Sequence, residues 1–108
     1  MLVDSHCHLD LPDFAPDLEA VVGRAGEAGV ATMLTISTRL DWFAGVRAVA
    51  ERFANVFCTA GIHPHEAKDA PSNAAGGVAG ELLRLADHPK VVGFGETGLD
   101  FFYEHSPR

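Results

Sequence analysis

Basic residues, cysteines and long apolar runs are all scarce in this 108-residue sequence. Eight Lys and Arg residues stand against fifteen Asp and Glu, so the formal net charge is −7 and the chain lacks a broad cationic surface for non-specific nucleic-acid binding. Cys7 and Cys58 are too few for a secreted disulfide framework, and we expect both to be reduced and buried. Asp4 interrupts the start of the chain where a signal peptide would be apolar, and no run approaches the length of a membrane span. We therefore expect a cytoplasmic protein with no membrane partner.

Short β-rich segments alternate along the chain with segments of helical periodicity. Val, Ile, Phe, Thr and Cys are concentrated in residues 2–9, 30–37, 56–62 and 91–95, which we predict to be four strands. Three helices are predicted between them: one around residues 18–25 that ends near Gly29, one around 42–53 with Thr38 and Asp41 as a capping box, and one from about residue 73 to just before Pro89. This order predicts an α/β fold of parallel βα units, with the strands paired in chain order and the helices on one side.

The C-terminal residues carry the signals of a further helix. Ser106 is a typical helix cap and Pro107 is favoured at the first helical position. We expect residues 1–108 to form a single incomplete domain of a longer βα protein, a frayed natural C-terminus being the alternative. His105 lies in the segment before this helix start, and we expect it to be simply exposed.

Two histidines stand one residue apart in the first predicted strand. Side chains at i and i+2 of a strand face the same way, so His6 and His8 can converge on one point. Two neutral imidazoles can bind one divalent transition metal, and the alternative is a structural pair hydrogen-bonded in a polar pocket. Cys7 faces the other side and is expected to pack under a helix.

Further polar groups follow the third and fourth strands. "GIHPHE" places His63 and His65 after the third strand, and "GETGLD" places Glu96 and Asp100 after the fourth. The carboxyl ends of parallel strands lie at one edge of the sheet, so these groups should gather with His6 and His8. A carboxylate beside imidazoles suits Zn, Mn or Mg, and a Glu can bridge two ions. His88 precedes the fourth strand, at the opposite end of the sheet, and is assigned no role in the site.

Three motifs together resemble a known family. "DSHCHLD", "GIHPHEA" and "GETGLDFFYEHSPR", in this order and spacing, resemble the N-terminal part of the TatD family of metal-dependent deoxyribonucleases, which have an amidohydrolase-like barrel. The resemblance covers essentially the whole chain and implies the N-terminal half of a TIM (β/α)8 barrel. It also implies that His6, His8 and Glu96 are metal ligands, and that His63 and His65 line the site near metal and phosphate.

The resemblance implies a hydrolase that cleaves phosphodiester bonds of DNA, at strand ends, by water activated by two divalent ions (Zn, Mn or Mg). Glu96 would then be catalytic as well as a ligand, and His63 or His65 would orient the phosphate or assist proton transfer. The family's remaining ligands come from later strands, so activity is expected to require a C-terminal half. An amidohydrolase-type enzyme acting on small-molecule amides or esters, and an inactive fragment acting only as a partner subunit, are the alternatives. The open edges of the first and fourth strands would favour self-association or pairing with that half.

Overall fold

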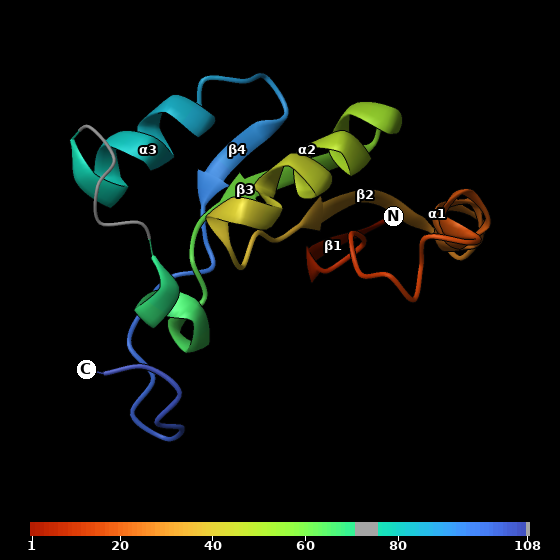
Figure 1. Cartoon of the computed structure of the whole chain (residues 1–108). Helices are drawn as coiled ribbons and strands as arrows, with labels where there is room; N and C mark the ends of the chain where they lie inside the picture. The colour runs from red at the N-terminus through yellow and green to blue at the C-terminus, as the bar shows by residue number, and fades with distance from the viewer. Residues whose placement is uncertain (71–75, 108) are drawn as a thin grey trace.

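The computed structural model describes residues 1–70 and 76–107 and shows an alternating α/β arrangement (Figure 1). Its four strands are β1 (Leu2–Cys7), β2 (Val30–Thr35), β3 (Val56–Ala60) and β4 (Val91–Phe94), and its α-helices are α1 (Leu18–Glu27), α2 (Phe43–Arg52) and α3 (Gly77–Leu85). Two 3-10 helices, η1 (Leu40–Trp42) and η2 (Pro64–Asp69), follow β2 and β3. The strands form one parallel sheet in the order β1-β2-β3-β4, so the predicted fold class and strand order are confirmed. The predicted start of the third helix, near residue 73, lies outside the described residues.

The core lies between one face of the sheet and the helices. Val56, Cys58 and Ala60 of β3 are fully buried, and they pack with Val46 and Ala50 of α2 in a single apolar cluster. Apolar side chains of α1 and α3 join the same cluster, and Figure 1 shows α2 running over the sheet between these two helices. All three helices therefore cover the same face, as predicted. Burial of apolar surface on this face is the main force holding the sheet to the helices.

Both cysteines are free thiols in this core. The Cys7 Sγ atom donates to the Leu34 carbonyl at 3.3 Å and packs against the apolar cluster, as predicted for a side chain under the helices. Burial raises the pKa of the Cys7 and Cys58 thiols to about 11, so both are protonated at neutral pH.

The other face of the sheet is apolar and open to solvent. Val3 is 62% exposed and Val92 is 58% exposed, and a shallow hollow of about 230 Å³ lies between them over Leu34 and Phe57. Within residues 1–70 and 76–107 no helix covers this face. A separate finding is that no helix in the described part of the chain is long and apolar enough to span a bilayer.

One predicted helix cap is wrong, and the helix predicted to begin after Ser106 stays a prediction. Helix α2 begins at Phe43, after η1, and no side chain caps its first turn. The predicted capping box fails because the Asp41 carboxylate is bound by the Arg39 guanidinium, at 2.8 and 2.9 Å. Ser106 caps no helix among the described residues; its hydroxyl donates to the His65 carbonyl at 3.1 Å. The predicted end of the first helix is confirmed, because Gly29 follows α1 with a φ of +97°.

Candidate metal centre

Buried hydroxyl groups and backbone bonds hold the carboxyl ends of the strands together. Thr35, Ser37 and Thr59 are 0, 0 and 5% exposed. The Thr59 hydroxyl donates to the Gly95 carbonyl at 2.7 Å, and the Ser37 carbonyl accepts from the Glu96 backbone N–H at 2.9 Å. These bonds fix where the chain leaves β4, and sequence reasoning missed all three hydroxyls because isolated Ser and Thr residues carry no motif.

His6, His8 and Glu96 lie together at this edge of the sheet. Each offers one potential ligand atom, and the three atoms all lie within 4.8 Å of one another. The His6 Nε2 atom is 3.3 Å from Glu96 Oε2, and the two imidazole rings have centroids 5.2 Å apart. Atoms that each bind one ion at about 2.0–2.2 Å are at most roughly 4.4 Å apart. Small side-chain rotations would therefore bring two nitrogens and one carboxylate oxygen onto a single divalent ion, so this donor set fits a metal.

A backbone carbonyl orients the His8 ring. The Nδ1 atom of His8 is 3.3 Å from the Ile36 carbonyl oxygen, which can only accept a hydrogen bond. Nδ1 therefore carries the proton and Nε2 keeps its lone pair, which is how carbonyl groups commonly orient metal-binding histidines.

His63 contacts Glu96 from the side opposite His6. Its Nδ1 atom accepts from the His65 backbone N–H at 3.0 Å, so the ring proton is on Nε2, which lies 3.1 Å from Glu96 Oε1. The Glu96 carboxylate is thus held between two imidazoles, one at each oxygen. In this arrangement His63 orients the carboxylate and presents a single N–H donor to the site.

His65 lies apart from Glu96, beside the loop that follows β4. Its Nε2 atom is 2.5 Å from Asp100 Oδ2, while Asp100 Oδ1 accepts from the backbone N–H groups of Tyr103 and Phe102 at 3.0 and 2.9 Å. These backbone hydrogen bonds, that of Tyr103 most of all, hold the pKa of Asp100 below its usual value. Asp100 is therefore an ionised acceptor that orients His65. His105 is exposed, as expected, and its ring centroid lies 4.3 Å from that of His65, with the two ring planes tilted by 46°.

His88 lies at the amino end of β4, away from this group. Its Nε2 atom is 3.2 Å from Glu51 Oε1, and its Nδ1 atom accepts from the Lys90 backbone N–H at 3.1 Å. Both ring nitrogens therefore have partners outside the candidate centre.

Arg39 joins two of the segments that flank the centre. Its guanidinium binds both oxygens of Asp41 and reaches Glu66 of η2 at 2.9 Å. The hydrogen bonds that the guanidinium donates to Asp41 are the main reason that the pKa of Arg39 is raised. Sequence reasoning missed this group, since the Glu66 contact joins residues from different loops.

Comparisons with known proteins place this geometry in context. The family model described as TatD related DNase matches residues 3–108. The uncharacterized metal-dependent hydrolase YjjV of Escherichia coli K12 is 36% identical over 100 residues, covering 93% of this chain and 38% of that protein. The 3'-5' ssDNA/RNA exonuclease TatD of Enterobacter lignolyticus is 39% identical over 100 residues, covering 93% of this chain and 37% of that protein.

A solved structure agrees with the sequence relatives. The crystal structure of the TatD homologue YjjV from Escherichia coli K12 matches 95% of this chain and 39% of that chain, with a TM-score of 0.79 and 33% sequence identity. The chain therefore spans about two fifths of the length of the relatives that it matches.

Proposed function

The chain belongs to the family of TatD related DNases, and on that basis we propose that it forms the N-terminal part of a metal-dependent hydrolase that cleaves phosphodiester bonds of DNA. The observation that carries this proposal is the group formed by His6, His8 and Glu96, whose ligand atoms lie within 4.8 Å of one another. Two imidazoles and a carboxylate suit Zn²⁺ or Mn²⁺, and Mg²⁺ is the third candidate. We propose two divalent ions per complete site, with Glu96 as the residue that reaches both.

The chemistry of the proposed site divides between the ions and the chain's own residues. Divalent ions supply Lewis acidity, which activates water and neutralises charge on a phosphate. Glu96 is held between His6 and His63, so its carboxylate is already oriented. The Nε2–H group of His63, which lies against Glu96 in this structure, would donate to a phosphate oxygen when substrate is present. We assign proton transfer to His65, because the Asp100 carboxylate fixes its orientation.

Single-stranded ends of DNA are the substrate that we propose. One relative is named a 3'-5' ssDNA/RNA exonuclease, and a strand end requires fewer phosphate contacts than a duplex. Because few phosphate contacts are needed, a chain with a formal net charge of −7 can bind such an end. An open groove of about 510 Å³, lined by His63, Glu96 and the aromatic residues 101–103, gives such an end room beside the candidate ligands.

We further propose that the four strands are the first half of a (β/α)8 barrel, and that full activity requires more βα units. β1 and β4 are the outer strands of the sheet, and the face that carries Val3 and Val92 is apolar and exposed. Unpaired strand edges and an uncovered apolar face favour association with further strands, from a C-terminal half or from a second copy.

The test is hydrolysis of a labelled single-stranded DNA by the purified chain with Zn²⁺, Mn²⁺ or Mg²⁺, alone and with a separately expressed segment of YjjV that follows the matched region. We expect negligible turnover by the chain alone and metal-dependent turnover when the segment is added. Glu96→Gln should abolish the restored turnover without lowering the melting temperature, because it removes a charge from the site and not from the core. His88→Ala, away from the site, is the matched control and should leave the restored turnover unchanged.

Two results would contradict the proposal. Turnover that Glu96→Gln does not affect would show that the hydrolysis does not occur at this site. Hydrolysis of lactones or amides in the same reconstituted mixture, with DNA left intact, would instead identify the amidohydrolase-type alternative.

A further inference from the structure

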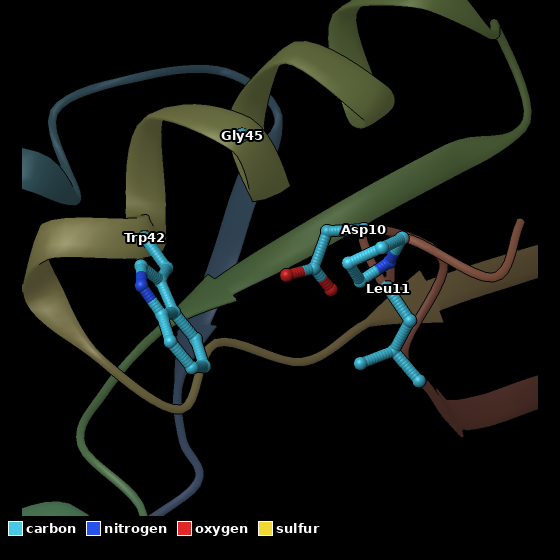
Figure 2. A pocket seen from close by; sticks show the side chains of 5 residues that line it. Asp10, Leu11, Trp42 and Gly45 are labelled. Atoms are coloured by element: carbon cyan, nitrogen blue, oxygen red, sulfur yellow. The ribbon is translucent and has the colours of Figure 1, made fainter. Parts of the chain in front are cut away.

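A groove of about 380 Å³ lies between the loop that follows β1 and the start of α2 (Figure 2). It is lined by Asp10, Leu11, Pro12, Trp42 and Gly45, and we name it the Trp42 slot. We propose that the Trp42 slot binds one nucleobase of a single-stranded nucleic acid, stacked on the indole and hydrogen-bonded to the Asp10 carboxylate. The identification of the ligand as a nucleic acid rests on the proposed function. The shape of the slot and its polar group are observed independently of that function.

Trp42 is an exposed and rigidly held aromatic ring. Its side chain is 53% exposed, although burying an indole would stabilise the fold. The Arg39 guanidinium lies over the ring, with Cζ 4.9 Å from its centroid, and is itself fixed by Asp41 and Glu66. Arg39 does not line the slot, whereas Trp42 does. The exposed part of the indole is available for stacking, and little ordering entropy is lost when a planar ring binds it.

Asp10 gives the slot its polar group. Among the described residues the Asp10 carboxylate accepts no hydrogen bond, and Figure 2 shows it directed towards Trp42. A lone carboxylate beside an aromatic ring selects a planar ligand with N–H donors on its edge, such as the amino groups of cytosine, adenine and guanine. Thymine presents one N–H between two carbonyl oxygens, which a carboxylate repels. We therefore expect the slot to bind cytosine better than thymine.

The Trp42 slot and the candidate metal centre are connected through neighbouring residues on two sides. Asp10 follows His8 by two residues, and the Leu11 backbone N–H donates to the His8 carbonyl at 3.4 Å. On the other side, Arg39 links Trp42 to Glu66 in η2, the helix that begins directly after His63. We therefore propose that a strand with one phosphate at the centre places one of its bases in the slot. With a formal net charge of −7, affinity for such a strand must come mainly from stacking and not from phosphate contacts.

Trp42 is the only tryptophan of the chain, so its fluorescence reports the slot directly. The 108-residue chain is titrated, in EDTA, with oligo(dC), oligo(dT) and an abasic oligonucleotide of equal length. We expect saturable quenching by oligo(dC), binding of oligo(dT) that is roughly fivefold to tenfold weaker, and no quenching by the abasic strand. Because EDTA removes any metal before the titration, failure of the metal site and failure of the slot give different results.

Gly45 allows the slot to be filled without disturbing the fold. It lies in α2, and no atom is within 4 Å of a Cβ built at this position. Gly45→Leu should therefore leave the melting temperature unchanged or raised, and weaken oligo(dC) binding by roughly tenfold or more. Gly23→Leu, at an equally open position in α1, is the matched control and should bind like the wild type. Asp10→Asn adds an amide donor, so the preference for cytosine over thymine should be lost.

Three results would overturn the proposal. Unchanged oligo(dC) binding by Gly45→Leu would show that the base does not enter the slot. Equal quenching by the abasic strand would show that the chain binds the DNA backbone and not a base. Sedimentation that shows a dimer of the wild type and a monomer of Gly45→Leu would show that the slot is covered by a second copy of the chain.

Discussion

Gly61 stands where the fold leaves no room for a side chain, and Gly61→Ala is therefore a sharp test of how Glu96 is positioned. A Cβ at Gly61 would lie 2.3 Å from both the carbonyl carbon and oxygen of Gly95, and 2.8 Å from the Glu96 nitrogen. An ordinary contact needs about 3.5 Å, so the ends of β3 and β4 would have to separate by roughly 1 Å. The obstructing atoms belong to the backbone and cannot rotate away.

That separation would act on the hydrogen bonds that hold Glu96. The Glu96 N–H donates to the Ser37 carbonyl at 2.9 Å, and the Ser37 hydroxyl donates to the Gly61 carbonyl at 3.1 Å. Overpacking of this kind costs about 1–3 kcal/mol, and a lost hydrogen bond adds about 1 kcal/mol. We therefore expect Gly61→Ala to lower the free energy of unfolding by about 2–4 kcal/mol and to weaken metal binding in parallel.

The assay is urea denaturation of the 108-residue chain followed by circular dichroism. Gly23→Ala is the matched control: no atom lies within 4 Å of its Cβ, so it should leave the stability unchanged or raise it by up to about 1 kcal/mol. A Gly61→Ala variant that loses less than about 0.5 kcal/mol would refute the reasoning, because the β3 and β4 ends would then be loose enough to accept a methyl group.

Two further predictions concern the core and its edge. The Lys90 ammonium donates to three backbone carbonyls, those of Phe53 and Ala54 after α2 and that of Val56 at the start of β3, at 2.9–3.0 Å. Lys90→Met should therefore lower the free energy of urea unfolding by about 1–3 kcal/mol, whereas Arg24→Met, at an exposed position, should change it by less than about 0.5 kcal/mol. Burial raises the pKa of the Cys7 and Cys58 thiols from 9.0 to about 11, so the unfolded chain loses these protons at a lower pH than the folded chain does. The contribution of the two thiols to the free energy of unfolding should therefore be constant below about pH 9 and be lost as the pH rises to about 11. Melting temperatures measured from pH 8 to 11 should fall less steeply for a Cys7→Ala, Cys58→Ala double variant, and equal slopes would contradict the assignment.

The sequence predicted the strand order well because each strand depends on local pattern and on the rules for βα connections. It predicted strands that run past their true ends, such as residues 30–37 where β2 is Val30–Thr35. Beyond Thr35, the Ser37 backbone N–H donates to the Thr59 hydroxyl instead of joining the ladder. The capping box failed for a similar reason, since a guanidinium from Arg39 competes for the Asp41 carboxylate. Such side-chain competition is not visible in a periodic pattern.

The candidate site, like the fold, could be predicted only in part from the sequence. The convergence of His6 and His8 follows from the two-residue period of a strand, and the arrival of Glu96 follows from parallel pairing. The different partners of His63 and His65 could not be predicted from the sequence. The orientation of His63 depends on a hydrogen bond from the His65 backbone N–H, and that of His65 depends on Asp100, which is itself held by the Tyr103 backbone N–H. The Trp42 slot also lacks a sequence signature, since its walls come from separate parts of the chain, the loop after β1 and the segment formed by η1 and the start of α2.

Direct metal titration is the measurement that tests the central claim most closely. Calorimetric titration of the chain with Zn²⁺ and with Mn²⁺ should show one ion bound through His6, His8 and Glu96. His6→Ala and His8→Ala should each weaken that binding roughly tenfold or more, since each removes one of three protein ligands. His88→Ala, which alters a histidine at the other end of the sheet, should leave it unchanged. Equal affinities for all four proteins would show that these two histidines are structural, and would contradict the assignment of a metal centre at the carboxyl ends of β1 and β4.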